Sequence, residues 1–333
     1  MKKIFLSKEK NFYKANLHCH STVSDGSKTP EELKEMYMQH GYSVIAYTDH
    51  DVLIPHGDLT DDKFLALNGY EMEINEKSND FSLSKTCHLC YIALDENNLT
   101  QVCYHRELYL FGNAPKYRTL IKYDDRKADF VREYTPDKIN EMIKEGRDNG
   151  FFVTYNHAVW SLETLGEYGK YRGMNAMEIC NYGCMAEGYS DYNEKEYDDM
   201  LRGGERIYCI ATDDNHNYRE DSFGGFTVIN ADKLEYGCIT AALTSGDFYA
   251  SQGPEIYELW YEDGKIGIEC SDCASIVLST GRRRADIIKG TDKPLTSAVF
   301  DTFDLDNYVR ITVTDLCGKH ANTNAYFVDE LKK

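Results

Sequence analysis

Short apolar runs alternate with amphipathic stretches over the first three quarters of the chain. From about residue 16 to residue 250, runs rich in β-branched and aromatic residues alternate with segments whose apolar residues recur at helical spacing. This alternation is typical of βα units with a mainly parallel sheet. It predicts strands at residues 16–21, 43–48, 64–74, 88–94, 151–156, 176–180, 207–212 and 227–230. We therefore expect an α/β fold.

Helices are expected between these strands, at residues 30–40, 136–149, 194–201 and 236–244. The first is the best defined, because Thr29 is a favourable N-cap and Pro30 suits the first turn. Gly41 follows its predicted end, a position where glycine is common. The order of strands and helices predicts an architecture like a barrel.

Two segments depart from this alternation. Residues 95–134 form a polar, tyrosine-rich and strongly charged insertion that is longer than an ordinary connection. It is either a lid over a site or a solvent-exposed surface loop, and the sequence favours neither interpretation. After residue 253 the pattern changes to strands without helices. This change predicts two domains, at residues 1–253 and 254–333, of which the second is a small β-sandwich.

Charge and hydropathy exclude some classes of protein. The chain has 37 basic and 56 acidic residues and a net charge of -19, which disfavours binding to long nucleic acids. No apolar segment approaches the length of a membrane span or of a signal peptide, so we expect a cytoplasmic protein without membrane contact.

The eleven cysteines are spread through ordinary globular sequence, which favours reduced thiols. Two Cys-x-x-Cys pairs stand out, Cys87 with Cys90 and Cys270 with Cys273. Together they could form a tetrahedral zinc site, but neither lies in the sequence context of a zinc ribbon. We interpret most of the cysteines as small, buried, apolar residues.

Candidate chemistry begins with two histidines on the first predicted strand. His18 and His20 are two residues apart, so both imidazoles project from one face of the strand and can share one ion. Alone, such a pair is more often a surface feature or part of a satisfied core. Asp25 strengthens the metal interpretation, because it lies in a Ser-Asp-Gly turn near the end of the same strand.

Acids and histidines also end two later strands. The strand at residues 43–48 leads directly into Asp49 and His50, where a neutral turn would be the structural expectation. The strand at residues 207–212 is followed by two acids and His216. The two-residue period of a strand places Asp214 on the same side as His216 and Asp213 on the other, so we prefer Asp214 as a ligand.

Glu71 and Glu73 alternate on an apolar strand, where burial of two carboxylates is unfavourable unless a cation compensates them. We prefer Glu71 as the ligand, and Glu73 either supports it or faces solvent. His88 and His157 lie at the ends of two further strands. Strand ends are where βα units place the residues of active sites, so these positions together predict one site.

The order of these motifs resembles the polymerase and histidinol phosphatase (PHP) superfamily over about residues 12–253. The motifs are His-x-His, Ser-Asp-Gly, Thr-Asp-His, Gly-Tyr-Glu, a later His, Asn-His-Ala and Asp-x-His. The resemblance implies a distorted seven-stranded (β/α) barrel with a site for three metal ions. Residues 242–254 are similar to a subgroup of stand-alone members that carry a β-rich C-terminal domain.

The resemblance also implies three groups of ligands. These are His18, His20, Glu71 and Asp214 for the first ion, the bridging Glu71 with His88 and His157 for the second, and Asp25, His50 and His216 for the third. Some relatives have histidine where this chain has Asp25. Mixed imidazole and carboxylate ligands suit Zn, Mn or Fe better than Ca or Mg.

Two or three such ions would activate water and bind phosphate oxygens, so we expect hydrolysis of small phosphomonoesters such as nucleotide or sugar phosphates. Glu71 and His50 are the expected catalytic ligands. The sequence does not decide whether Asp49 or water protonates the leaving group. Candidates for phosphate contacts are Arg118, Arg172 and Arg219, although surface arginines are the simpler interpretation.

Two other functions remain open at this point. A phosphodiesterase or 5'-3' exonuclease for short oligonucleotides would use the same metals. A non-catalytic, metal-stabilised interaction module would use the C-terminal domain to bind a partner.

Overall fold

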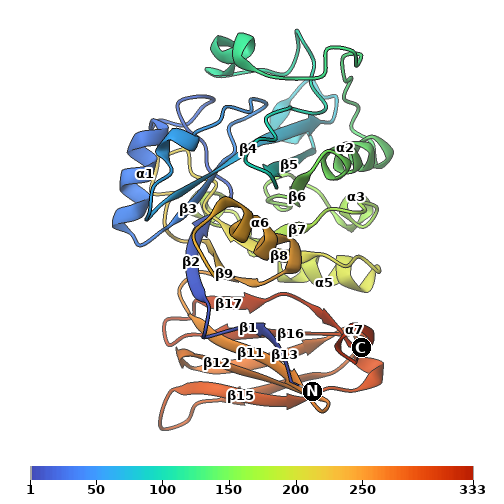
Figure 1. The fold of residues 1–333 in the computed structure, drawn as a ribbon. Helices are drawn as coiled ribbons and strands as arrows, with labels where there is room; N and C mark the ends of the chain where they lie inside the picture. The colour runs from blue at the N-terminus through green and yellow to red at the C-terminus, as the bar shows by residue number, and fades with distance from the viewer. Residues whose placement is uncertain (1, 333) are drawn as a thin grey trace.

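The computed structural model describes residues 2–332, in which helices cover a large mixed sheet that continues into a strand-rich C-terminal region (Figure 1). The four predicted helices are confirmed as α1 (Pro30–Gln39), α2 (Pro136–Asp148), α5 (Glu194–Arg202) and α6 (Tyr236–Ser245). The cap of α1 is reciprocal, because the Thr29 hydroxyl accepts from the Glu32 amide while the Glu32 carboxylate accepts from the Thr29 amide. Two short helices are α3 (Leu165–Tyr168) and α4 (Tyr182–Ala186).

The strands expected between residues 16 and 250 are present in one sheet. They are β2 (Asn11–Asn16), β3 (Val44–Tyr47), β4 (Leu65–Asn75), β5 (Thr86–Ala93), β6 (Phe151–Tyr155), β7 (Ala176–Asn181), β8 (Tyr208–Thr212) and β9 (Phe226–Ala231), with β10 (Phe248–Ser251) added. Their order in the sheet is β10-β9-β2-β3-β4-β5-β6-β7-β8.

The expectation of a mainly parallel sheet is wrong in part. The groups β2-β3-β4 and β6-β7-β8 are parallel, but β5 is antiparallel to both of its neighbours and β9 is antiparallel to β2. Between β4 and β5 the chain has only the single 3-10 turn Phe81–Leu83, and parallel pairing needs a longer crossover. The chain therefore returns as a hairpin.

The first predicted strand is wrong in its bounds, because β2 ends at Asn16 and His18 and His20 follow it. After Asn16 the backbone forms hydrogen bonds with the segments that follow β3 and β8, but these bonds do not make a regular strand pairing. The Asp214 amide donates to the His18 carbonyl at 3.0 Å, and the His20 amide donates to the Asn215 carbonyl at 3.2 Å. The segments that follow β2 and β8 thus lie side by side.

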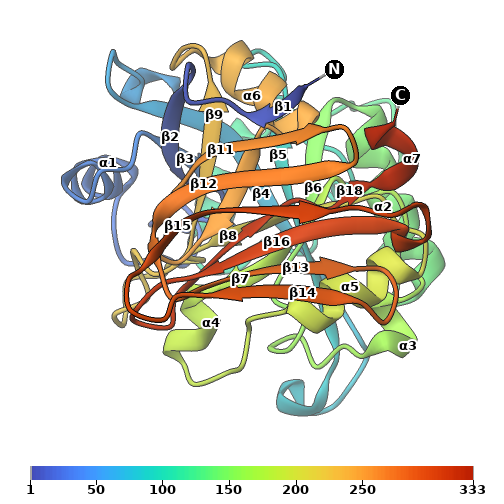
Figure 2. The ribbon, with the colours of Figure 1, turned by 90° about the horizontal axis from the view of Figure 1, so that it is seen from below.

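The C-terminal region contains two sheets that pack face to face (Figure 2). Its elements are β11 (Ile256–Glu262), β12 (Lys265–Cys273), β13 (Ser275–Thr280), β14 (Ala285–Lys289), β15 (Leu295–Asp301), β16 (Tyr308–Thr314), β17 (His320–Thr323), β18 (Tyr326–Phe327) and the short α7 (Val328–Leu331). One sheet has the order β1-β11-β12-β15, where β1 is the N-terminal strand Lys3–Leu6. The other joins the large sheet through pairing of β17 with β10. Leu259, Ile268 and Ile311 belong to the core that the two sheets share.

The first strand of the chain, β1 (Lys3–Leu6), pairs with β11. It therefore connects the two ends of the sequence, and the predicted domain boundary at residues 253 and 254 stays a prediction. None of the helices within residues 2–332 combines the length and apolar character that crossing a membrane requires. The cytoplasmic location also stays a prediction.

Candidate metal centre

All nine predicted metal ligands converge at one edge of the β2–β8 sheet. Strands β2, β3, β6 and β8 deliver their ligands just after their carboxyl ends, as expected for βα units. Glu71 instead lies within β4, just beyond the part that pairs in parallel with β3. Strand β5 runs the opposite way, so His88 reaches the same edge from near its amino end. The predicted ligands are buried, apart from Asp25 and His216, which are half-buried.

The Glu71 carboxylate lies at the centre of this cluster. Its oxygens are 3.1 Å from His18 Nε2, 3.3 Å from His20 Nε2, 3.3 Å from His50 Nδ1, 3.2 Å from His88 Nδ1 and 3.4 Å from His157 Nε2. The side-chain amide of Asn156 donates a further hydrogen bond to Glu71 at 2.9 Å. Although burial opposes it, this surrounding charge holds the pKa of Glu71 well below its usual value.

Asp214 is the second buried carboxylate of the cluster. Its Oδ1 is 3.1 Å from His18 Nε2 and 3.0 Å from His20 Nε2, and its Oδ2 accepts a hydrogen bond from the Asn181 amide at 3.0 Å. Asp213 points away, and its carboxylate accepts from the backbone amides at residues 223–225. The two adjacent acids thus face opposite sides, with Asp214 in the cluster.

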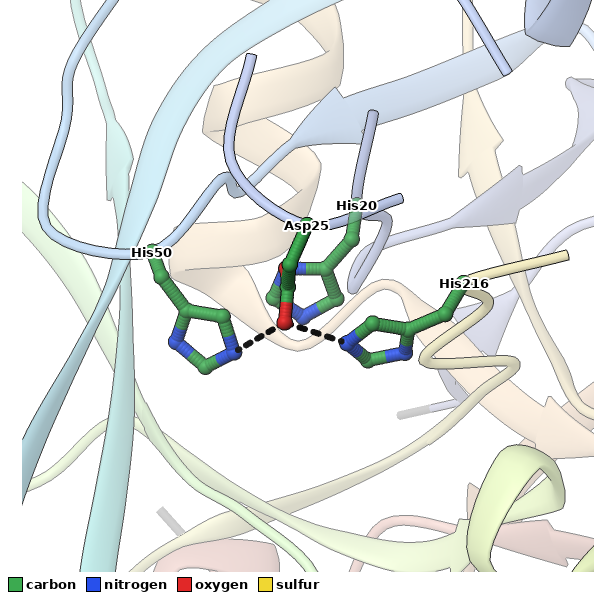
Figure 3. Close-up of side chains that lie close together, drawn as sticks. All are labelled: His20, Asp25, His50 and His216. Carbon is green, nitrogen blue, oxygen red and sulfur yellow. Dashed lines mark ion pairs between the residues drawn. The ribbon is translucent and has the colours of Figure 1, made fainter. Parts of the chain in front are cut away.

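A further group is formed by His20, Asp25, His50 and His216 (Figure 3). Asp25 Oδ2 is 3.4 Å from His216 Nε2 and 3.8 Å from His50 Nε2. The Nδ1 atom of His20 is 3.7 Å from Asp25, whereas its Nε2 faces Asp214. His20 therefore lies between this group and the one around Glu71.

The donor atoms of the cluster fit divalent cations. Four of its buried atoms have no partner in hydrogen-bond geometry within residues 2–332, namely His20 Nδ1, His50 Nδ1, His88 Nε2 and Asp214 Oδ1. An unsatisfied buried polar atom costs about 1–3 kcal/mol. Several of these atoms approach neighbouring donor atoms at 3.0 to 3.7 Å without the angles of a hydrogen bond, as ligands around a shared ion do. A divalent metal would satisfy them with its preferred nitrogen and oxygen ligands.

The charges of the histidines depend on the neighbouring acids. Burial lowers the pKa of His18 and His20, but Asp214 and Glu71 outweigh it and raise both pKa values well above normal. The same acids raise the pKa of His157 to about 9. Burial and the nearby His20 instead lower the pKa of His50 to about 3. Protons and metal ions therefore compete for these imidazoles, and metal binding should strengthen as the pH rises.

Sequence reasoning missed Glu178, a fully buried acid on β7. Its carboxylate accepts a hydrogen bond from His18 Nδ1 at 2.7 Å and from the His157 amide at 2.9 Å. It therefore fixes the orientation of His18, as acids behind metal-bound histidines commonly do. A signal was present, because Glu178 interrupts an apolar strand in the way that drew attention to Glu71.

Asp49 lies beside the cluster but faces the loop that carries Asp25. Its carboxylate accepts hydrogen bonds from the backbone amides and the hydroxyls of Ser21 and Ser24 at 2.8 to 3.0 Å. This arrangement orders the loop. A catalytic role for Asp49 stays a prediction.

A cleft of about 860 Å³ opens onto the cluster, and residues 109–111 of the insertion form part of its wall. The insertion is fixed in place by Asn113, whose backbone amide donates to the Ser24 carbonyl at 2.7 Å. It is also held by Arg132, which is buried, forms an ion pair with Asp51 and donates to the Glu73 carbonyl at 2.6 Å. The insertion thus contributes to the site at one end.

The three candidate arginines lie in different places. Arg118 donates to backbone carbonyls within the insertion, and Arg172 forms an ion pair with Glu205 at 3.2 Å. Arg219 lines the cleft, where it lies 3.4 Å from Glu187. Only the position of Arg219 brings it near the cluster.

The two Cys-x-x-Cys pairs lie in different sheets. Cys90 lies next to His18 and Glu71, whereas the thiols of Cys270 and Cys273 are 3.8 Å apart in the C-terminal region. The pairs therefore form no common zinc site within residues 2–332. Most of the cysteines are buried and all eleven are free, as expected.

No family model and no curated protein matches the chain. Among solved structures, the chain is similar to a two-domain protein from Bacteroides vulgatus that contains a predicted PHP-like metal-dependent phosphoesterase. The two share 16% identity with a TM-score of 0.44, and the match covers 97% of this chain and 96% of the other. A proposed metal-dependent phosphoesterase from Bifidobacterium adolescentis has 16% identity and a TM-score of 0.38, over 61% of this chain and 87% of the other.

An amidohydrolase from Chromobacterium violaceum, solved with bound sulfate and without metal, has 15% identity and a TM-score of 0.37, over 62% of this chain and 89% of the other. Two of these similar solved structures are thus named as metal-dependent phosphoesterases, one of them PHP-like.

Proposed function

We propose that this chain is a metal-dependent phosphoesterase of the PHP superfamily, and that it hydrolyses small phosphomonoesters such as nucleotide or sugar phosphates. The observation that carries the proposal is the convergence of nine His, Asp and Glu side chains, seven of which line one cleft, with buried donor atoms that lack hydrogen-bond partners within residues 2–332. We also propose that strands β2–β8 form the distorted barrel of that family, closed where the segments after β2 and β8 meet.

We propose that the ligands divide as the family resemblance implies, around Glu71 and Asp214 on one side and around Asp25 on the other. The short distances within each of these groups support this division. Divalent ions held there would lower the pKa of water toward neutrality and neutralise charge on the phosphate oxygens. In the reaction, a bond forms between the water oxygen and phosphorus while the bond from phosphorus to the leaving oxygen breaks. The leaving oxygen takes up a proton.

The protein's own contribution is to hold the ligands in one geometry. Glu178 orients His18, while the amides of Asn156 and Asn181 orient Glu71 and Asp214. These hydrogen bonds are buried, so the ligands need little rearrangement when ions bind.

The charge near the cluster favours small monoesters over the oligonucleotides of the alternative proposal. A nuclease needs a basic groove along the nucleic acid backbone. Among the described residues that line the cleft, Arg219 is the one basic side chain other than histidine, and it is paired with Glu187. The net charge of -19 also disfavours a polyanion.

The test is hydrolysis of a panel of phosphomonoesters, a generic diester and short oligonucleotides by protein reconstituted with Zn²⁺ or Mn²⁺. His50→Ala and Glu71→Ala should each lower turnover at least about a hundredfold, because each removes a ligand from the cluster. Arg118→Ala, outside the cleft, is the matched control and should keep full activity. Full activity of either ligand variant would refute the mechanism, and turnover of oligonucleotides alone would favour the nuclease.

A further inference from the structure

Aromatic rings form much of the cleft wall outside the metal ligands. Phe81, Tyr109, Phe111, Trp160 and Tyr218 all line it, and they come from four separate segments of the chain. Phe81 and Tyr218 are 61% and 71% exposed, which is unusual for such large rings near one site. Exposed aromatic groups around a polar centre are typical of a binding surface.

Two of these rings contact the metal ligands themselves. The Trp160 ring lies edge to face against His157 and His88, with centroid separations of 5.0 and 5.5 Å. The Phe111 ring lies 4.7 Å from that of His50. A group attached to a phosphate at the cluster would therefore lie beside an aromatic ring.

The segments that carry Tyr109 and Trp160 are held in place before any ligand binds. Arg132 packs under the Tyr109 ring at 4.1 Å, and its backbone amide donates to the Tyr109 hydroxyl at 3.0 Å. Arg132 is in turn fixed by its buried ion pair with Asp51. The Trp160 amide donates to Asp191 at 2.8 Å. Rings positioned in advance lose little conformational entropy when a ligand packs against them.

The fixed charges of the cleft disfavour a second anionic group on the ligand. Glu73, Glu187 and Asp221 line the cleft beyond the predicted metal ligands. Among the described lining residues, Arg219 is the one basic side chain other than histidine, and it is already paired with Glu187. A carboxylate or second phosphate on the ligand would meet these acids, and like charges repel at short range.

From these features we propose that the substrate is a phosphomonoester whose leaving group carries a planar aromatic ring and no second anionic group. This inference rests on the proposed function, and it favours aromatic phosphates over the phosphates of simple sugars. Trp160 is its main specificity-determining residue, because its ring touches two of the ligand histidines.

The test is calorimetric binding of three phosphonates, whose carbon–phosphorus bond resists hydrolysis, to the Zn²⁺-loaded full-length protein. Phenylphosphonate should bind about three- to tenfold more tightly than cyclohexylphosphonate, which has a similar size but no planar ring. 4-Carboxyphenylphosphonate should bind more weakly than phenylphosphonate, because it adds a negative charge. Trp160→Leu should abolish the preference for phenylphosphonate, whereas Trp160→Phe should retain it and Trp260→Leu, in the C-terminal region, should leave it unchanged.

Equal binding of the phenyl and cyclohexyl compounds, binding of neither, or an unchanged preference in Trp160→Leu would overturn this inference. Metal-dependent hydrolysis of monoesters is measured on the same preparations. If hydrolysis is present and the preference is absent, only the aromatic inference fails. If the preference is present without hydrolysis of any monoester, the proposed function fails and the binding surface stands.

Discussion

The metal-centre region and the C-terminal two-sheet region differ in how their buried charged groups are paired. Arg310 of the C-terminal region is 2% exposed and donates to Asp198 and Glu194 of helix α5, both at 2.9 Å. Asp306 is fully buried and likewise bonds to two arginines. In the metal-centre region, buried imidazole and carboxylate atoms crowd around Glu71 and several lack hydrogen-bond partners within residues 2–332.

This difference distinguishes a structural network from a binding site. A buried charge that has a fixed opposite charge needs nothing from outside the chain. A cluster of buried donor atoms without partners is completed only when a cation binds. The C-terminal region should therefore be stable without metal, and the metal-centre region should depend on it.

The largest expected effect is on the C-terminal region. Arg310→Met removes the cation that Asp198 and Glu194 share. We expect a loss of about 3 kcal/mol, the lower end of the range for breaking a buried ion pair, because the Asp198 and Glu194 side chains are 14% and 40% exposed and water can solvate them. Urea denaturation should show this loss both with and without metal. Arg206→Met is the matched control, because Arg206 is about half exposed in its ion pairs and should change stability by less than about 1 kcal/mol. Equal losses in the two variants would contradict the comparison.

Metal removal should have the next largest effect, confined to the metal-centre region. An ion present at a hundred times its Kd stabilises the folded state by about 2.7 kcal/mol. We therefore expect chelation to lower the Tm of the wild-type protein by at least about 5 °C in a calorimetric scan. In Glu71→Ala the shift should be much smaller. A wild-type Tm that does not respond to chelation would contradict a resident metal.

Glu163 provides a test of buried charge without a cation. It is buried, and the hydroxyls of Tyr134, Tyr155 and Tyr171 donate to it. Burial raises its pKa from 4.5 to about 7, against the effect of these hydrogen bonds. The folded state therefore favours the neutral acid, and this contribution is present below about pH 4.5 and is lost as the pH rises through 7.

Glu163→Gln cannot ionise, so its stability relative to the wild-type protein should increase by about 2–3 kcal/mol between pH 5 and pH 8. Urea denaturation of both proteins at the two pH values measures this difference. If the difference in stability between the two proteins is the same at pH 5 and pH 8, Glu163 is ionised in the folded protein at both pH values.

The smallest effect is expected for Glu178→Gln, which keeps the shape of the side chain but removes its charge behind His18. Replacement of such a supporting acid typically lowers metal affinity at least about tenfold. Competition with a fluorescent zinc chelator measures the affinity. Glu194→Gln, which changes an acid of α5 that pairs with Arg310, is the control and should leave the affinity unchanged. Unchanged affinity in Glu178→Gln would remove it from the site.

Local patterns predicted the elements of the fold well but not how they pair. The cap at Thr29 and the spacing of apolar residues were sufficient for α1, because both signals act within one turn. The antiparallel direction of β5 depends on how the chain returns after β4, which no local pattern records. The pairing of β1 with β11 joins residues far apart in sequence and was likewise not predicted.

The candidate site was predictable where polar residues interrupt an apolar strand. Glu71 was selected in this way, whereas Asp214 was selected because it follows a strand on the same side as His216. The structure places both in the cluster. Glu178 shows the same interruption, but it is a single acid on its strand, whereas Glu71 alternates with Glu73. The position of Arg132 was not predictable, because its pairing with Asp51 is made by a long insertion of irregular structure.

The most direct test of the central claim is the number of metal ions per chain. Purified protein is equilibrated with Zn²⁺ or Mn²⁺, passed over a desalting column and analysed by plasma mass spectrometry, beside the variant Asp214→Ala. Our account predicts two or three ions per wild-type chain and the loss of at least one in the variant. Less than one ion per wild-type chain with either metal, or the same content in both proteins, would contradict it.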